Sequence, residues 1–140
     1  MTRNNLSNAL AQLQARGHRL TRPRRRIVEQ LFNQRRSVTA YELHQQLGDR
    51  DVSLASVYRT LELLVALGVA ETVVRSGAEQ QYLACSLDHH HHIICDCCGV
   101  VAELDECSLA PFERLIESQS GFQIDGHTLE FHGRCVSCQQ

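Results

Sequence analysis

The sequence contains no lysine, so arginine supplies all 14 of its Lys/Arg charges. The planar guanidinium group can contact phosphate or guanine through two hydrogen bonds at once. No apolar run approaches the roughly 20 residues that a membrane-spanning helix requires. The first residues, Met1-Thr-Arg-Asn-Asn, also lack the charged-then-apolar layout of a signal peptide. We therefore expect a cytoplasmic protein with no membrane partner.

Cysteine is absent before Cys85, although the chain contains seven cysteines. Thiols in a cytoplasmic protein are more often metal ligands or redox groups than disulfide partners. Residues 85–98 contain four cysteines and four histidines, and Cys135 and Cys138 follow later in the chain. This clustering predicts that the second half of the chain binds metal.

The motif pattern of a zinc deaminase is also absent. Such enzymes carry a His-x-Glu motif and a proline before their paired cysteines. This sequence has no His-x-Glu, and Ile94 precedes Cys95. We therefore expect a binding protein and not an enzyme.

The charges are divided unevenly along the chain. Residues 1–75 carry 12 arginines and six acidic residues, a formal charge of +6. Residues 76–140 carry two arginines and ten acidic residues, a formal charge of −8. This asymmetry indicates that only the first half meets a polyanion, although a chance distribution of surface charge is the alternative.

Helical spacing of apolar residues and capping signals predict four helices in the first half, at about residues 6–16, 22–32, 39–47 and 54–67. Thr21, Thr39 and Ser53 are the expected N-caps, and Thr39-Ala-Tyr-Glu42 fits a capping box. Residues 69–83 predict a β-hairpin that turns around Gly77. Two helices joined by a short turn and followed by a hairpin are typical of a winged helix-turn-helix.

The helix at 54–67 is the expected recognition helix. Its apolar residues share one face, which leaves Ser56, Tyr58 and Arg59 on the others. Tyr58 can pack against a thymine methyl group, and Arg59 can reach a guanine edge or a phosphate. The alternatives are a partly buried core ring for Tyr58 and a solvated ion pair for Arg59. The arginine-rich segment 19–26 lies at another helix start, where free backbone N–H groups also favour phosphate.

Two separate Cys-x-x-Cys motifs predict a closed structural zinc site with four thiolate ligands: Cys95, Cys98, Cys135 and Cys138. Redox-active thiols are the competing interpretation. We expect a strand at 100–104, a helix at 109–117 and a strand at 122–131 between the motifs. So small a segment is hard to stabilise by itself, so zinc would supply folding free energy.

The four histidines at 89–92 lead into Ile93 and Ile94, which predicts a strand. Side chains alternate along a strand, so His90 and His92 share one face while His89 and His91 share the other. A solvated polar strand is the alternative. Cys85, a few residues earlier, favours metal binding.

We expect a sensor site on the first of these faces, with Cys85 as the third ligand beside His90 and His92. A carboxylate would complete a tetrahedron, and Glu71 in the first strand of the hairpin is the best candidate. A thiolate among imidazoles and a carboxylate favours zinc over manganese or ferrous iron. The opposite face, His89 and His91, can meet His127 from the later strand.

These residues together resemble the ferric uptake regulator family, and within it the zinc uptake regulator branch. The similarity runs from about Leu13 to Cys138. It rests on Arg19-Leu-Thr-Arg-Pro-Arg, on Ser56-Val-Tyr-Arg-Thr-Leu, on the histidine run with Ile-Ile-Cys-x-x-Cys-Gly99, on His127 and on the C-terminal Cys-x-x-Cys.

The resemblance implies an α+β protein with three parts. Residues 1–84 would form a winged helix-turn-helix DNA-binding domain, 85–88 a hinge, and 89–140 a small α/β dimerisation domain with the structural zinc. The implied function is that of a zinc-responsive repressor. Its metal-loaded homodimer would bind an A·T-rich palindrome in double-stranded operator DNA and control metal-uptake genes, and the apo protein would release the DNA.

The resemblance also implies roles for single residues. Tyr58 and Arg59 match residues of the family's recognition helix, and Arg19 matches a basic residue that enters the minor groove. The sensor ligands match Cys85, His90 and His92, with Glu71 in place of a short acid, and Glu103 matches a carboxylate that some members add.

The family's additional metal site matches His89, His91 and His127. Its usual glutamate falls on Ala110, so this third site is incomplete or borrows Glu106 or Glu113. Cys97 and Cys107 have no family role and are interpreted as a spare thiol and a packed thiol.

The resemblance leaves the sensed metal to be decided. Iron and peroxide regulators of the family have a histidine near the position of Arg36, which is not a ligand, and this departure favours zinc. About two zinc ions per chain are expected. An iron- or manganese-responsive regulator is the alternative within the family, and a zinc storage or chaperone protein is the alternative outside it.

Overall fold

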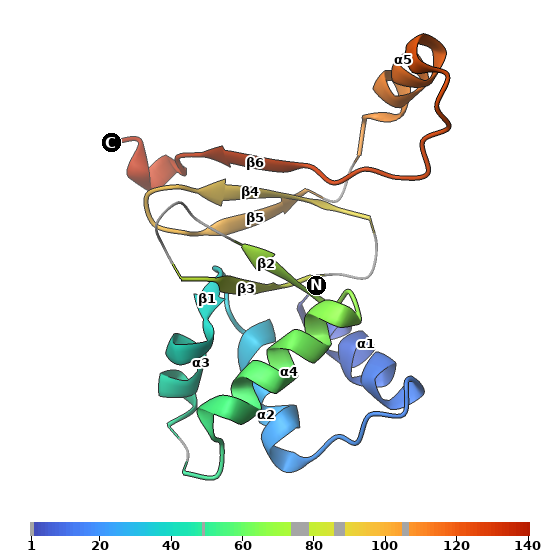
Figure 1. The fold of residues 1–140 in the computed structure, drawn as a ribbon. Coiled ribbons are helices and arrows are strands. Elements are labelled where there is room, and N and C mark those ends of the chain that lie inside the picture. The colour runs from blue at the N-terminus through green and yellow to red at the C-terminus, as the bar shows by residue number, and fades with distance from the viewer. Residues whose placement is uncertain (1, 49, 74–78, 86–88, 105–106) are drawn as a thin grey trace. The chain divides into compact units, whose positions relative to one another are not determined.

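The computed structural model of this chain describes residues 2–48, 50–73, 79–85, 89–104 and 107–140. The chain divides into two compact units, Met1–Leu87 and Asp88–Gln140 (Figure 1). The division falls inside the segment 85–88 that was expected to be a hinge. Residues 86–88 lie outside the described residues, so the hinge stays a prediction.

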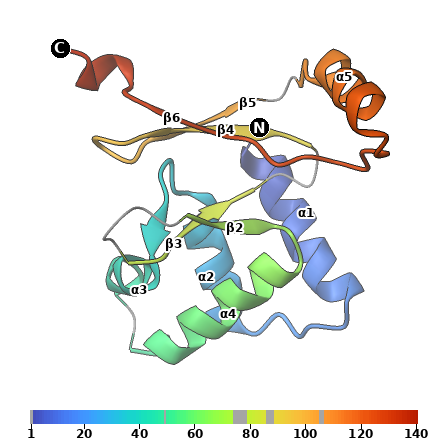
Figure 2. The ribbon, with the colours of Figure 1, turned by 45° about the horizontal axis from the view of Figure 1, so that its top comes forward.

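The first unit is a winged helix-turn-helix. Its described elements are α1 (Thr2–Ala15), α2 (Arg22–Phe32), β1 (Val38–Thr39), α3 (Ala40–Leu47), α4 (Leu54–Ala66), β2 (Ala70–Val73) and β3 (Gln81–Ala84). The strands form an antiparallel sheet in the order β1-β3-β2. The four helices gather on one side of β2 and β3 (Figure 2). The helix pair α3–α4 followed by the β2–β3 pair confirms the predicted fold.

Side-chain caps fix where α2, α3 and α4 begin, and the N-caps are those expected from the sequence: Thr21, Thr39 and Ser53. The hydroxyl of Thr21 accepts a hydrogen bond from the Arg24 N–H at 3.3 Å, and α2 starts at the next residue. Thr39 forms the predicted capping box, because its hydroxyl accepts from the Glu42 N–H and the Glu42 carboxylate accepts from the Thr39 N–H. These bonds satisfy backbone donors that a helix start leaves free.

The core of the first unit is built from the apolar stripes of its helices. Ile27 and Leu31 of α2 and Leu61 and Leu64 of α4 are each fully buried. Val38 of β1, also fully buried, joins the same hydrophobic cluster. The sequence did not predict β1, because its two residues acquire strand structure only by pairing with β3.

The β2–β3 pair matches the expected hairpin in register, with Ala70 opposite Ala84 and Val73 opposite Gln81. The predicted turn at Gly77 lies outside the described residues. Helix α1 begins at Thr2, four residues before the expected start at Leu6. No apolar residue marks that first turn, so hydrophobic spacing could not locate it.

The second unit is a three-stranded sheet with one helix. Its described elements are β4 (His91–Cys95), β5 (Val101–Leu104), α5 (Ala110–Ser120), β6 (Glu130–Gly133) and the 3-10 helix η1 (Val136–Cys138). The strand order is β5-β4-β6. β4 pairs with β5 in antiparallel fashion and with β6 in parallel fashion. The histidine run therefore enters the central strand.

The expected strand at 122–131 is wrong over most of its length, because strand structure begins only at Glu130. Gly121 ends α5 in the left-handed conformation, with φ of 73°. The N–H of Ile124 then donates to the Glu117 carboxylate of the same helix at 2.8 Å. The Ile124 N–H, which the prediction placed in a strand ladder, is thus hydrogen-bonded to a side chain of α5.

The second unit has little hydrophobic core of its own. Its buried hydrophobic side chains, among the residues described, are Ile94 and Cys95. Helix α5 contributes no buried residue, and its Phe112 and Leu115 are 57% and 50% exposed. So small a core gives little stability, so this unit needs another source of free energy.

Within the described part of the chain, every helix lacks the length or the apolar character needed to cross a membrane.

The capping box at the start of α3 generates a stability prediction. Replacing Thr39 with alanine removes the acceptor for the Glu42 N–H, and loss of such a cap costs about 1 kcal/mol. Urea denaturation of Thr39→Ala should show a free energy of unfolding lower by about that amount. Gln45→Ala, at an exposed position of the same helix, is the control and should change stability by less than about 0.5 kcal/mol. Equal stabilities for the two variants would contradict the capping role.

Candidate metal centres and nucleic-acid interface

The four cysteines of the two Cys-x-x-Cys motifs meet at one end of the second unit's sheet. Cys95 ends β4, and Cys98 lies in the turn after it. Cys135 is the N-cap of η1, and Cys138 is its last residue. Gly99 turns the chain with φ of 75° and donates its N–H to the Cys95 carbonyl at 2.9 Å. The four sulfur atoms all lie within 4.8 Å of one another.

The spacing of these sulfurs suits a tetrahedral zinc ion. A zinc–sulfur bond of about 2.3 Å implies a separation of about 3.8 Å between two ligands of a tetrahedron. Cys98 Sγ and Cys135 Sγ are 3.7 Å apart. All seven cysteines are free thiols, so no disulfide competes for these four. The donor set and its spacing therefore fit the expected structural zinc.

Local hydrogen bonds already favour a thiolate in this cluster. The Cys135 N–H donates to Cys95 Sγ at 3.3 Å. This bond and further backbone donors from Cys98 and Cys97 lower the pKa of Cys95 to about 6. The neighbouring sulfur of Cys135 instead raises the pKa of Cys138. A metal ion would replace that sulfur–sulfur hydrogen bond, because it binds both groups as thiolates.

The histidine run splits between two faces as expected from strand alternation. The imidazole rings of His90 and His92 have centroids 4.6 Å apart. Those of His89 and His91 have centroids 4.7 Å apart. Each pair is thus close enough to contribute two ligands to one ion.

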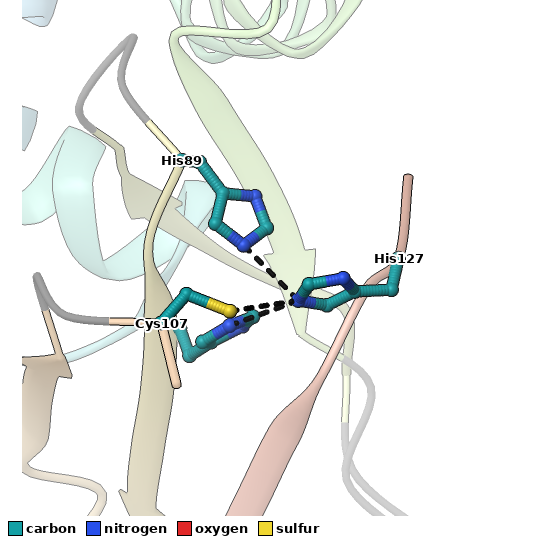
Figure 3. A group of neighbouring side chains, drawn as sticks. His89, Cys107 and His127 are labelled. Carbon is teal, nitrogen blue, oxygen red and sulfur yellow. Dashed lines mark hydrogen bonds between the residues drawn. The ribbon is translucent and has the colours of Figure 1, made fainter. Parts of the chain in front are cut away.

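A second metal-ligating cluster forms around His127, in the segment between α5 and β6. Its Nε2 atom is 3.0 Å from His89 Nε2 and 3.1 Å from His91 Nε2. Figure 3 shows His89, His127 and Cys107 pointing toward one another. The structure therefore brings together the three histidines expected at the third site.

Cys107 is the residue of this cluster that the sequence interpretation missed. Its Sγ lies 3.3 Å from His127 Nε2, and the ligand atoms of Cys107 and the three histidines all lie within 4.8 Å of one another. A lone cysteine outside any motif gave no signal for this position. A usable hint was its place just ahead of Ala110, where the family's glutamate is missing.

Burial favours the neutral form of His91 within the histidine cluster. Burial of His91, which is 4% exposed, disfavours its charged form and lowers its pKa, and the neighbouring His89 and His127 lower it further. On the far side of the His127 ring, Nδ1 lies 2.6 Å from Glu113 Oε1. Neutral imidazoles are the form that binds metal.

The predicted sensor ligands are divided between the two units. In the first unit, Glu71 lies opposite Leu83, and the Cys85 N–H donates to the Val69 carbonyl at 3.1 Å as a continuation of the same ladder. Glu71 and Cys85 therefore share one face of the β2–β3 pair. His90 and His92 belong to the second unit. The assembly of all four into one site stays a prediction.

Glu103, the predicted extra ligand, lies on β5 directly opposite His92 of β4. Directly paired residues on antiparallel strands project to the same face of the sheet. Glu103 is exposed. It is therefore placed on the His90–His92 face, as a supplementary carboxylate there must be.

The predicted DNA-contacting residues lie on the outer side of α4. Tyr58 is 41% exposed, and Arg59 is also exposed, whereas Val57 and Leu61 are fully buried. The Arg59 guanidinium donates to the Ser56 hydroxyl at 3.3 Å, which groups these polar side chains in the first turns of the helix. Tyr58 is thus not a member of the buried core, although its ring is only partly exposed.

Arg19 lies just before α2 and is exposed. Its carbonyl oxygen accepts a hydrogen bond from Arg24 Nη1 at 2.6 Å, so the two arginines are held close in space. Arg25 faces solvent and lies 4.0 Å from Glu29, an exposed pair that contributes little. The segment offers exposed positive charge next to a helix start, which suits phosphate.

Arg36 takes part in an ion pair near the place where iron and peroxide regulators were expected to have a histidine. Its Nη2 lies 3.1 Å from Glu42 Oε1. The pKa of Glu42 is lowered, first by the hydrogen bond from the Thr39 N–H and also by Arg36. This position therefore supports the start of α3 and supplies no metal ligand.

Comparison with known proteins gives one consistent result. The model of the ferric uptake regulator family matches residues 15–132. The peroxide-responsive repressor PerR of Staphylococcus aureus is 27% identical over 136 residues, which cover 96% of this chain and 91% of that protein.

Two solved structures agree in fold over nearly the whole chain. The ferric uptake regulator of Vibrio cholerae is 29% identical, with a TM-score of 0.67, and the match covers 91% of this chain and 99% of that one. A zinc uptake regulator complexed with zinc and DNA is 25% identical, with a TM-score of 0.72, and the match covers 99% and 95%. Because these sequence identities are so similar, they do not indicate which signal this chain responds to.

The four-cysteine cluster generates a prediction about zinc content and folding. Cys135→Ser removes one thiolate from a closed site, so purified protein should contain about one zinc ion less per chain. The second unit should then lose its cooperative thermal transition, because zinc binding is coupled to its folding. Metal analysis and calorimetry provide the measurement. Cys97→Ser, at an exposed cysteine outside the four, is the matched control and should retain both properties. An unchanged zinc count in Cys135→Ser would disprove the assignment.

Proposed function

Because this chain belongs to the ferric uptake regulator family, we propose that it is a zinc-responsive repressor that binds operator DNA as a homodimer and controls metal-uptake genes. Members of this family are metal-responsive regulators of transcription and not enzymes. What we propose in addition to this family function is that the metal is zinc, that the DNA is an operator and that the protein is a homodimer.

The observation that carries the zinc assignment is the thiol of Cys85 on the same face of the β2–β3 pair as Glu71. A set of one thiolate, one carboxylate and two imidazoles suits zinc better than manganese or ferrous iron, which prefer harder oxygen ligands. The ion pair of Arg36 with Glu42 adds support, because Arg36 lies near the place where the resemblance puts a histidine in the iron and peroxide regulators.

We propose that zinc regulates DNA binding by linking the two units. Glu71 and Cys85 come from the first unit and His90 and His92 from the second, so an ion that takes all four as ligands would restrain the segment between them. The recognition helices of a dimer would then match major grooves separated by about 34–36 Å or a multiple of it. Moving a 1:99 equilibrium to 99:1 requires a differential zinc affinity of about 5.5 kcal/mol.

The homodimer proposal is supported by the apolar surface of the second unit. Its exposed large apolar side chains include Phe112, Leu115 and Ile116 of α5, and Phe122 and Phe131 beyond it. Phe122 is 75% exposed. We propose that these side chains take part in a protein–protein interface, because exposed apolar surface of this kind often does. Pairing of two such surfaces would also supply the core that the single unit lacks.

The DNA proposal rests on α4 and on the arginine-rich segment before α2. Arg59 and Tyr58 are exposed in the first turns of α4, where a recognition helix presents its side chains to base edges. Arg19 provides a positive charge that suits a narrow A·T-rich minor groove. A zinc storage protein would have no use for either feature.

The sensor proposal predicts that Cys85→Ser uncouples DNA binding from zinc. The variant loses the thiolate ligand, so its DNA affinity at buffered free zinc should fall by more than about tenfold, while its helical content and dimer mass stay unchanged. The measurement is a DNA-binding titration of the full chain against buffered zinc, ferrous iron and manganese. Cys97→Ser is the control and should respond as the native chain does. Zinc-dependent binding that survives in Cys85→Ser would sink the sensor assignment, and a response to iron or manganese alone would sink the choice of zinc.

The recognition-helix proposal predicts a loss of specific affinity in Arg59→Ala. Removing one arginine contact to a base edge costs about 1–3 kcal/mol, or 5- to 200-fold in affinity for operator DNA. Arg114→Ala, at an exposed arginine of α5 in the other unit, is the control and should bind normally. Fluorescence anisotropy at several salt concentrations provides the measurement, because DNA contacts weaken steeply with salt. Salt-independent binding, or equal loss in both variants, would argue against this interface.

A further inference from the structure

We propose that Cys107 is the fourth ligand of the third metal site, which is then a zinc site with one thiolate and three imidazoles. The site deepens the proposed metal-dependent function, on which it rests for its biological role. Its ligands are Cys107, His89, His91 and His127.

The distances between the four ligand atoms suit one ion. Zinc–nitrogen bonds of about 2.0–2.1 Å and a zinc–sulfur bond of about 2.3 Å imply ligand separations of about 3.3–3.6 Å in a tetrahedron. His127 Nε2 is 3.0 Å from His89 Nε2, 3.1 Å from His91 Nε2 and 3.3 Å from Cys107 Sγ. Small outward movements of a few tenths of an ångström would admit the ion.

The contact between Glu113 and His127 fixes which ring nitrogen faces the site. Glu113 Oε1 lies 2.6 Å from His127 Nδ1, so the carboxylate holds a proton on that nitrogen. The lone pair of Nε2 is then free to point toward His89, His91 and Cys107. A carboxylate behind a metal-bound histidine is the usual way to orient the ring and raise its basicity.

The same contact decides between the carboxylate candidates for the fourth ligand. Glu113 binds the nitrogen on the opposite side of the ring from the ligand cluster, so it acts as the partner of His127 and not as a ligand. Glu106 lies outside the described residues. Ala110 has no donor atom. Cys107, three residues before α5, places its sulfur in contact with His127 Nε2.

The replacement of a carboxylate by a thiolate changes which metal the site prefers. Thiolates favour zinc and disfavour manganese and other hard cations. A closed four-ligand site of this kind also leaves no open position for a bound substrate. We therefore assign the site a zinc-selective role and place the total at three zinc ions per chain.

Cobalt(II) is the probe for this proposal, because a thiolate bonded to cobalt gives a charge-transfer absorption that imidazole and carboxylate ligands do not give. The test uses full-length Cys85→Ser protein with zinc in the four-cysteine cluster, so that Cys97 and Cys107 are the two thiols left, and only Cys107 lies beside the three histidines. Addition of cobalt should produce the thiolate band. Adding Cys107→Ser should abolish the band, whereas adding Cys97→Ser should leave it at full intensity.

A second variant covers the case in which Cys107→Ser does not fold. Cys107→Asp restores a carboxylate, so it should bind cobalt at this site without the thiolate band and should lower the zinc-over-manganese preference by more than about tenfold. Glu113→Gln should keep the band but weaken metal affinity by about 10- to 100-fold, because it removes only the partner of His127.

Three results would overturn the proposal. They are no thiolate band in the Cys85→Ser protein at saturating cobalt, a band that persists after Cys107 is replaced, and a band lost with Cys97. None of these measurements includes DNA. A failure of the proposed repressor function would appear in the DNA titrations and leave the cobalt spectra unchanged.

Discussion

The metal chemistry of this protein depends on the two-residue period of β4 and on the anchoring of that strand at Cys95. Successive side chains of a strand point to opposite faces, so four adjacent histidines are separated into two pairs. A shift of register by one residue would exchange the pairs and destroy both sets of ligands. Backbone pairing with β5 and β6 holds this register, and at the end of β4 the Cys135 N–H also donates to Cys95 Sγ. The four-cysteine cluster thus lies at the end of the strand whose register places the two histidine pairs.

The two units are stabilised by different physical means. The first has a continuous hydrophobic core that contains Ile27, Leu31 and Leu61, and side-chain caps start its helices. The second has few buried apolar side chains among its described residues and exposes the apolar residues of α5. Metal ligation and subunit pairing are the two sources of free energy left to it. Loss of metal would therefore act on the second unit before it affected the recognition helix.

Local signals in the sequence predicted much of the fold, whereas contacts between distant residues escaped prediction. The capping box joins Thr39 and Glu42, which are only three positions apart, and the structure confirms it. The strand expected after Gly121 is wrong. The Ile124 N–H donates to the Glu117 side chain instead, and the spacing of apolar residues cannot predict such a contact. Cys107 was overlooked for the same reason, since only the folded chain brings its sulfur beside His127, 20 residues later.

The comparisons show that the fold alone does not select the signal. Relatives named for responses to different signals match this chain about equally well. Selectivity must therefore reside in a few side chains at fixed positions of a common scaffold. In this chain Arg36 is paired with Glu42, and sulfur stands at Cys85 and Cys107. Under the proposed assignments, the arginine offers no ligand that suits iron, and each sulfur would be a ligand that suits zinc. Because they lie on different elements, they would shift the metal preference together without altering the fold.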